Sequence, residues 1–220
     1  MRDDIKAKPR GAGNSRFEPA DSTDFFPTPP WGTRALIEHV MKPLFLFNRN
    51  HKVWEPACGT LDMVRPLQEY YAGVRATDID ARGDTSGNIK DEFDFANGVT
   101  CNANKNNCCD WVITNLPFNL FMDFFISSLG AARHGLALLA PLTVIEGSGR
   151  YEEIFKPYAG KFCVAPFVER LPIVKNTVRR DATTARAYAW LVVAKQSGGI
   201  PPLLHIPPCR KQLERDEDYS

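Results

Sequence analysis

Short apolar runs that alternate with helical patterns constrain the fold of this chain more than any other feature. Residues 111–114 (WVIT) and 135–140 (GLALLA) are almost wholly apolar, as strands are when helices cover both faces of a sheet. Further strands are predicted at residues 52–55, 74–77, 161–165 and 188–194. Helices are predicted at residues 33–41, 62–71, 120–132 and 147–155. This alternation favours an α/β domain with a mainly parallel sheet that is covered by helices.

The composition is that of an ordinary globular protein, because 44% of the 220 residues are hydrophobic and 24% are charged. We expect a flexible tail at residues 1–22, a single domain at 23–208, and a charged C-terminal tail at 209–220. The net charge of +1 neither demands nor excludes a nucleic-acid partner, since a local basic face is enough to contact phosphates. No apolar run is long enough to span a bilayer, and residues 1–16 lack the apolar core of a signal peptide.

The cysteines carry no signature of a metal site or of a disulfide framework. They are Cys58, Cys101, Cys108, Cys109, Cys163 and Cys209. No pair has the Cys-x-x-Cys spacing of a structural zinc site, and a domain of this size does not need disulfide bonds to be stable. We therefore expect mostly reduced thiols in a cytoplasmic protein, without a metal and without membrane association.

Two candidate binding elements follow the first two predicted strands. The first is the turn Glu55-Pro56-Ala57-Cys58-Gly59-Thr60, in which glycine allows the backbone to approach a ligand closely. The second is Asp78, whose carboxylate is placed to accept hydrogen bonds from ribose hydroxyls. An ordinary strand-to-helix turn and a simple turn residue remain the alternatives at these two positions. No strand is predicted between residues 80 and 93, and residues 97–109 are predicted to form a polar loop.

The most informative element is Asn115-Leu116-Pro117-Phe118, which directly follows the apolar run at 111–114. An asparagine at the tip of a buried strand presents an amide oxygen that accepts a hydrogen bond from an amino group. Pro117 keeps the backbone out of a helix, and Phe118 offers a flat ring on which a base can stack. A structural turn with a core phenylalanine is the alternative. Upstream, the prolines of residues 24–31 (DFFPTPPW) predict an extended, aromatic segment.

Together these motifs resemble those of S-adenosylmethionine-dependent methyltransferases that modify amino nitrogens. Glu55-Pro56-Ala57-Cys58-Gly59 resembles the cofactor loop of that family, and Asn115-Leu116-Pro117-Phe118 resembles its Asn-Pro-Pro-Phe/Tyr catalytic tetrapeptide. Phe26-Pro27-Thr28-Pro29 resembles the N-terminal cofactor-binding segment. The order of the three motifs is similar to the gamma arrangement of adenine-N6 enzymes. Residues 25–208 are most similar to the small DNA methyltransferases of phages and prophages, which act in bacterial or phage-infected host cytoplasm.

The resemblance implies a Rossmann-like class I methyltransferase fold, with a mainly parallel seven-stranded sheet, an antiparallel last strand, and helices on both faces. S-adenosyl-L-methionine is the implied cofactor. Thr28 and the loop at Glu55 to Gly59 would bind its amino-acid end, and Asp78 would bind its ribose. Asp94 would bond the adenine amino group of the cofactor, while Phe95 would pack on that ring.

The resemblance also implies roles for the tetrapeptide. The target adenine is flipped out or single-stranded, and Phe118 stacks on it. The Asn115 side chain and the Leu116 carbonyl accept the two N6 hydrogens, which concentrates the lone pair on the nitrogen that attacks the methyl group. This chain departs from the family at two positions, where Leu61 replaces the second loop glycine and Leu116 replaces the first proline of the tetrapeptide. Leu61 is expected to push the loop away from the cofactor, and Leu116 is expected to cost rigidity.

A basic segment at residues 169–186 is the candidate nucleic-acid contact. Its basic residues are Arg170, Lys175, Arg179, Arg180 and Arg186. In a nearly neutral chain this local excess is suited to contact phosphates, although an ordinary solvated loop is the alternative. DNA is the expected partner. RNA, a protein glutamine amide, and an inactive cofactor-binding module remain open, and the sequence does not indicate the oligomeric state.

Overall fold

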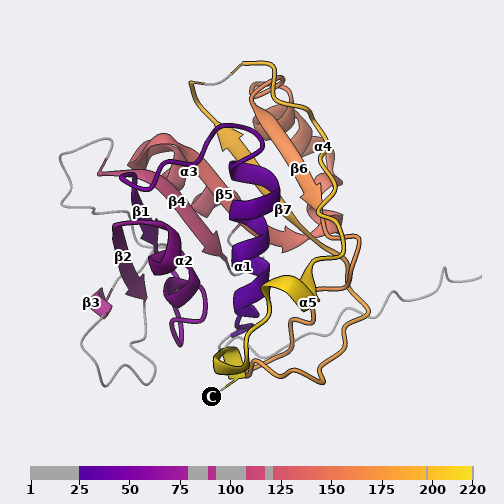
Figure 1. Ribbon diagram of the computed structural model, residues 1–220. Coiled ribbons are helices and arrows are strands. Elements are labelled where there is room, and N and C mark those ends of the chain that lie inside the picture. The colour runs from indigo at the N-terminus through magenta and orange to yellow at the C-terminus, as the bar shows by residue number, and fades with distance from the viewer. Residues whose placement is uncertain (1–24, 79–88, 93–107, 117–120, 197, 220) are drawn as a thin grey trace, which may run out of the picture.

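The computed structural model describes residues 25–78, 89–92, 108–116, 121–196 and 198–219. Its centre is one seven-stranded sheet with the strand order β3-β2-β1-β4-β5-β7-β6 (Figure 1). The strands are β1 (Lys52–Glu55), β2 (Gly73–Asp78), β3 (Ile89–Glu92), β4 (Cys109–Asn115), β5 (Ala132–Pro141), β6 (Phe162–Pro166) and β7 (Tyr188–Ala194). All pairs are parallel except those made by β7, which runs antiparallel to both β5 and β6. The expected mainly parallel sheet with an antiparallel last strand is confirmed.

Helices precede or connect most of these strands. They are α1 (Pro30–Leu36), which continues into the π-turn η1 (Ile37–Met41), α2 (Val64–Tyr70), α3 (Phe121–Ala131), the 3-10 turn η3 (Leu142–Ile145), α4 (Ser148–Arg150), which continues into the π-turn η4 (Tyr151–Phe155), α5 (Arg210–Leu213) and the 3-10 turn η5 (Asp216–Tyr219). The four helices predicted from the sequence are therefore all present, with small differences at their ends.

Three local predictions are wrong. The extended segment ends earlier than predicted, because α1 begins at Pro30. Proline is tolerated there since the first helical turn has no internal acceptor for its N–H groups. Cys109 belongs to β4 and not to the preceding loop; it is buried, and its thiol donates to the Ala131 carbonyl at 3.7 Å. The edge strand β3 was not predicted at all, because Ile89 is the only apolar residue among its four.

Alternating side chains of the central strands enter two separate cores, one on each face of the sheet. Val53, Trp111 and Ile113 face the core that α1, η1 and α2 cover. Trp54 and Val112 face the opposite core, which α3 and η4 cover. Figure 1 shows α1 and α2 in front of the sheet and α3 behind it. Helices on both faces, as expected, leave the strand ends as the places where polar side chains can reach solvent or a ligand.

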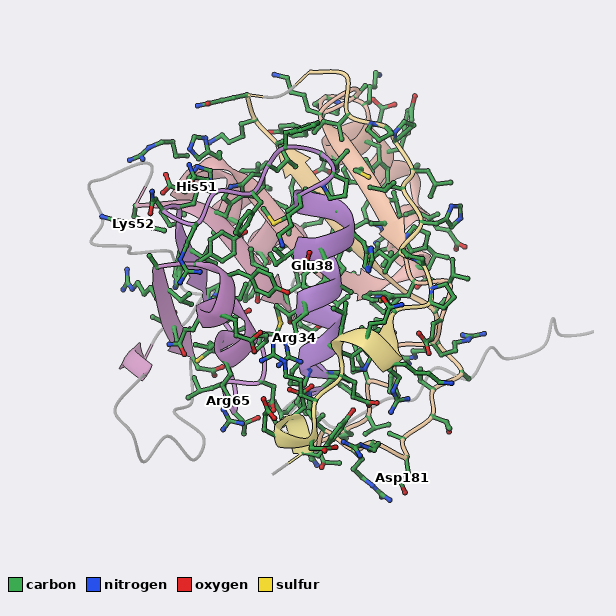
Figure 2. The ribbon with its side chains drawn as sticks, viewed as in Figure 1. Arg34, Glu38, His51, Lys52, Arg65 and Asp181 are labelled. Carbon is green, nitrogen blue, oxygen red and sulfur yellow. The ribbon has the colours of Figure 1, made fainter. Side chains whose placement is uncertain are left out.

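The C-terminal segment, residues 209–219, is attached to the domain through the buried side chain of Arg34. This guanidinium uses all five of its N–H donors, on Glu69 of α2, on the Leu213 carbonyl, and on both carboxylate oxygens of Asp218 at 2.8 Å. Burial lowers the pKa of Arg34, but the hydrogen bonds and charges of Asp218 and Glu69 outweigh it and raise the pKa above its ordinary value. Arg34 lies on α1 beside the C-terminal helical turns (Figure 2). Because the bidentate pair with Asp218 is buried, it fixes the geometry of this segment.

Four of the cysteines are free and buried, as expected: Cys58, Cys109, Cys163 and Cys209. Burial raises the pKa of the Cys163 and Cys209 thiols to about 11, so they are un-ionised at neutral pH. Cys108 is disulfide-bonded, so four of the five described cysteines are free, in line with the expectation of mostly reduced thiols. Among the residues that the structure describes, no helix is both long and apolar enough to cross a membrane.

Replacing Asp218 with alanine is expected to lower the free energy of unfolding by about 3 kcal/mol, because two N–H donors of the buried Arg34 would lose their acceptors and Glu69 alone would balance its charge. Asp216 offers a matched control two residues away. It pairs with the exposed Arg180, and its own side chain is 95% exposed, so Asp216→Ala should change stability little. Urea unfolding of both variants measures the difference. Equal urea midpoints for Asp218→Ala and Asp216→Ala would show that the bonds between Arg34 and Asp218 do not hold the C-terminal segment.

Candidate functional site

Three polar side chains that the sequence analysis selected meet at one edge of the sheet. Glu55, Asp78 and Asn115 are the last residues of β1, β2 and β4. Because these strands are parallel neighbours in the order β2-β1-β4, their carboxyl ends lie side by side. Lys52 begins β1, so it and the preceding His51 lie at the opposite edge of the sheet. Figure 2 shows both side chains well away from Arg34 of α1. Glu55, Asp78 and Asn115 therefore converge at the carboxyl edge of the sheet.

The loop after β1 is held by hydrogen bonds to the end of β2. The Cys58 N–H donates to the Thr77 carbonyl at 3.1 Å, and the Gly59 N–H donates to the Asp78 carboxylate at 2.7 Å. The Glu55 carboxylate accepts a bond from the Ala57 N–H at 2.9 Å. Asp78 thus has a structural role in the loop, in addition to any role toward a ligand.

Glycine is required at position 59 for two reasons. Its φ of +49° lies in the left-handed region, which side chains with a Cβ adopt at a cost. A Cβ at this position would also lie 2.5 Å from a ring carbon of Phe25. The N-terminal segment at residues 25–29 therefore packs directly against the loop, so two motifs that are far apart in the sequence form one wall of the site.

Leu61 occupies the position where the resembling family has a second glycine, and its backbone has φ +68°. A left-handed leucine costs about 1–2 kcal/mol, whereas complete burial of its side chain contributes about 1.5–3 kcal/mol. Its side chain is 9% exposed and packs in a small cluster with Cys58, Val64 and Ala76. Burial therefore offsets the backbone strain. The side chain of Leu61 thus lies inside this cluster, and the expected displacement of the loop away from the cofactor stays a prediction.

The Asn115 amide is oriented by two acceptors of the N-terminal segment. Its Nδ2 donates to the Phe26 carbonyl oxygen at 2.7 Å and to the Thr28 hydroxyl oxygen at 3.0 Å. A carbonyl oxygen can only accept, so the nitrogen must face Phe26 and the oxygen Oδ1 must point to the other side. Thr28 is buried, whereas Asn115 is half-buried. The arrangement leaves an oriented hydrogen-bond acceptor at the tip of β4.

Glu55 is fully buried beneath this edge of the sheet. Its Oε1 accepts the Ala57 N–H and the Thr114 hydroxyl, the latter at 2.6 Å. Its Oε2 is buried and has no hydrogen-bond partner among the described residues. Burial raises the pKa of the Glu55 carboxyl to about 8, although the bonds from Thr114 and Ala57 act in the opposite direction. A buried carboxyl with one orphaned oxygen is suited to receive a cationic or hydrogen-bond-donating group from a ligand.

Of the remaining predicted site residues, one is buried and several lie outside the described residues. Leu116 is buried, with 2% of its surface exposed. Pro117, Phe118, Asp94 and Phe95 lie outside the described residues, so their roles stay predictions. Thr114, which donates to Glu55, was missed by the sequence analysis. It is the polar residue that ends the apolar run at 111–114, and that signal could have drawn attention to it.

The basic segment at residues 169–186 lies beside the N-terminal segment. The Asn176 N–H donates to the Phe25 carbonyl at 2.9 Å, one residue before the carbonyl that holds Asn115. Three of its arginines are engaged within the protein: Arg170 donates to the Ala185 carbonyl, Arg179 pairs with Asp181, and Arg180 pairs with Asp216 and lies over the Tyr219 ring. Lys175 is exposed. The segment is therefore close to the site, but much of its charge is locally compensated.

No protein-family model matches the sequence, and no curated protein matches it. Among solved structures, a putative hemolysin from Lactococcus lactis is similar with a TM-score of 0.50 and 12% identity, over 83% of this chain and 94% of that chain. A predicted O-methyltransferase from Agrobacterium tumefaciens has a TM-score of 0.49 and 12% identity, over 81% and 85%. A dimethyladenosine transferase from Plasmodium falciparum has a TM-score of 0.47 and 16% identity, over 78% and 64%. At these identities, similarity extends to the fold alone.

The raised pKa of Glu55 predicts a pH-dependent stability. Between pH 4.5 and about 8 the folded protein keeps a proton that the unfolded chain releases, so the free energy of unfolding should fall as pH rises. The free energy of unfolding should fall by at most about 1.4 kcal/mol per pH unit. The stabilisation from the retained proton of Glu55 is complete below pH 4.5 and lost by about pH 8. Glu55→Gln removes the titrating group. Urea unfolding at four pH values should show wild type losing stability relative to this variant, and parallel profiles would contradict the prediction.

Proposed function

We propose that this protein is an S-adenosylmethionine-dependent methyltransferase that acts on an exocyclic amino nitrogen, with N6 of adenine in DNA as its substrate. The observation that carries the proposal is the orientation of Asn115. Its Nδ2 is held by Phe26 and Thr28, so Oδ1 is directed away from them as an acceptor for a substrate N–H. This acceptor stands at the start of Asn115-Leu116-Pro117-Phe118, the sequence that resembles the catalytic tetrapeptide of such enzymes.

The residues around the loop after β1 fit the proposed cofactor, which supplies an activated methyl group on a sulfonium sulfur when bound. Glu55 has a buried oxygen without a partner among the described residues, and this oxygen can accept a bond from an ammonium group. The left-handed Gly59 allows the loop to approach a ligand without a side chain. Asp78 would hold ribose hydroxyls while it anchors the Gly59 N–H. Asp94 and Phe95 would contact the adenine end.

In the proposed mechanism, Asn115 Oδ1 and the Leu116 carbonyl oxygen accept the two hydrogens of the substrate amino group. These bonds would draw the nitrogen lone pair out of conjugation with the ring. As the new bond from N6 to the methyl carbon forms, the bond from that carbon to the sulfonium sulfur would break, and the methylated nitrogen would lose one proton to solvent. Leu116 contributes only its backbone carbonyl, so the substitution of proline by leucine leaves this function intact. An amide is not a base at neutral pH, so the contribution of Asn115 is positioning and electrostatic stabilisation. Phe118 would stack on the target base.

A nucleic acid is favoured over a protein substrate because a basic segment lies next to the site, and the resemblance to phage and prophage enzymes favours DNA. Asn176, in the middle of this segment, contacts Phe25, and the following residue Phe26 holds Asn115. Phosphates that bind the segment would therefore lie close to the base that enters the site. The ion pairs of Arg179 and Arg180 are exposed, so both side chains can exchange their carboxylate partners for phosphates at little cost.

The first test is transfer of labelled methyl from S-adenosylmethionine to unmethylated duplex DNA. We expect label in N6-methyladenine, and Asn115→Ala should reduce the rate by about 100-fold or more while cofactor binding is retained. Asn50→Ala makes the same chemical change at an exposed position before β1 and should keep full activity.

Other outcomes of this test discriminate between the alternatives. Cofactor binding without transfer to DNA would contradict the DNA substrate, and structural RNA and glutamine-containing protein would then be assayed. Absence of cofactor binding by the wild-type protein would contradict the enzyme proposal and favour an inactive module.

The role of the basic segment predicts opposite effects from two substitutions. Arg179→Ala with Arg180→Ala should weaken DNA binding for all sequences and reduce the slope of log affinity against log salt by up to about 2. Asp181→Ala should strengthen binding, because it frees the Arg179 guanidinium. A salt titration of fluorescently labelled duplex measures both variants. Unchanged affinities would show that phosphates do not contact this segment.

A further inference from the structure

The two acceptors that hold the Asn115 amide lie on an unusually constrained piece of backbone. Phe26 precedes Pro27, and Thr28 precedes Pro29. A proline fixes its own φ and also restricts the preceding residue to extended conformations, so both acceptor residues are limited in the same way. Pro29 has φ −53° and ψ 127°, which is extended, before α1 begins at Pro30. The spacing between the Phe26 carbonyl and the Thr28 hydroxyl is therefore set before any ligand binds.

Thr28 is also fixed by its packing. It is 2% exposed, and its branched Cβ restricts the rotation that would move the hydroxyl. The Phe25 ring beside Gly59 and the Asn176 bond to the Phe25 carbonyl hold the start of the same segment. The acceptors thus sit on a rigid strip of chain, and the Asn115 amide adapts to them.

The terminal torsion of an asparagine has two broad orientations that differ by half a turn. In the alternative orientation, Asn115 Oδ1 would face the Phe26 carbonyl oxygen, and two acceptors would meet without a hydrogen. The Thr28 hydroxyl could still rotate to donate in that orientation, so the carbonyl selects the orientation and the hydroxyl holds the second hydrogen. With both bonds made, Nδ2 has no hydrogen left, and only Oδ1 of the amide remains to bond a ligand.

We propose that Thr28 is a positioning residue, whose hydroxyl oxygen holds the Asn115 amide so that Oδ1 is presented to the amino group of the substrate. This inference rests on the proposed function, because it assigns the purpose of the Asn115 orientation. It adds a role for Thr28 that is separate from ligand binding, since the hydroxyl oxygen accepts from Asn115 while its own hydrogen stays available to donate. Phe26 contributes through its backbone carbonyl, so a substitution at position 26 would not remove this acceptor.

The test uses the full-length protein and begins with a measurement that does not depend on activity. In uniformly ¹⁵N-labelled protein, the Asn115 side-chain amide is assigned by its loss in Asn115→Ala. Both hydrogens should exchange with deuterium more slowly than those of the exposed Asn50 amide. In Thr28→Val one of them should exchange about tenfold faster, since one hydrogen bond is lost. Thr28→Ser, which keeps the hydroxyl, should exchange as the wild type does.

The second measurement separates positioning from binding. At saturating S-adenosylmethionine, Thr28→Val should lower kcat about tenfold while KM for DNA changes little, and Thr28→Ser should restore kcat. Cofactor affinity is measured by calorimetry for each variant, because Thr28→Val also removes a donor. Should Thr28→Val fail to fold, Thr28→Ala against Thr28→Ser makes the same comparison.

The outcomes are distinct. Unchanged amide exchange in Thr28→Val would overturn the proposal, and so would unchanged kcat in an active wild-type enzyme. A wild-type protein that methylates no amino-nitrogen substrate would overturn the proposed function instead, whatever the exchange experiment shows about the bond between Thr28 and Asn115.

Discussion

Burial of the central sheet on both faces is the constraint on which the rest of this structure depends. Side chains of β1 and β4 enter the core alternately on the two sides, so their strands have no polar face. Ionisable and amide groups can then occur only where the strands end. Because β2, β1 and β4 are parallel neighbours, Asp78, Glu55 and Asn115 are brought to a single edge. The candidate site is thus a direct consequence of how the apolar core is closed.

The segment before α1 connects this edge to the rest of the protein. Its Phe25 ring packs against Gly59 of the loop after β1, and its Phe26 and Thr28 accept hydrogen bonds from Asn115 of β4. The helix that follows it carries Arg34, whose buried pair with Asp218 holds the C-terminal segment. This short stretch of chain therefore connects the sheet edge with the C-terminal segment.

Two departures from ordinary structural rules lie in the same loop. Glu55 is a buried carboxyl with one oxygen that has no hydrogen-bond partner in the described part of the chain, and Leu61 is a leucine with a left-handed backbone. Each has a cost to stability, and each is tolerated because the surrounding contacts hold it: Thr114 and Ala57 on Glu55, the apolar cluster on Leu61. Such departures concentrate at functional sites, where the geometry needed for a ligand differs from the most stable one. Their position supports the assignment of this loop to ligand binding.

The amino-acid sequence by itself determined the α/β class, the positions of the main strands and helices, and the placement of Glu55, Asp78 and Asn115 at the carboxyl ends of strands. These follow from apolar periodicity and from the rule that parallel strands share their carboxyl edge, both of which are local or topological properties. The sequence did not predict β3, where one apolar residue gives no pattern, or the start of α1, where proline is compatible with two conformations.

Only the tertiary structure decided which atoms meet. That Asn115 donates to Phe26 and Thr28, that Thr114 donates to Glu55, and that Asp218 enters the core to bind Arg34 depend on segments up to 184 residues apart in the sequence. Contacts of this kind are selected by packing and by the need to satisfy buried polar groups, and no local pattern in the chain encodes them.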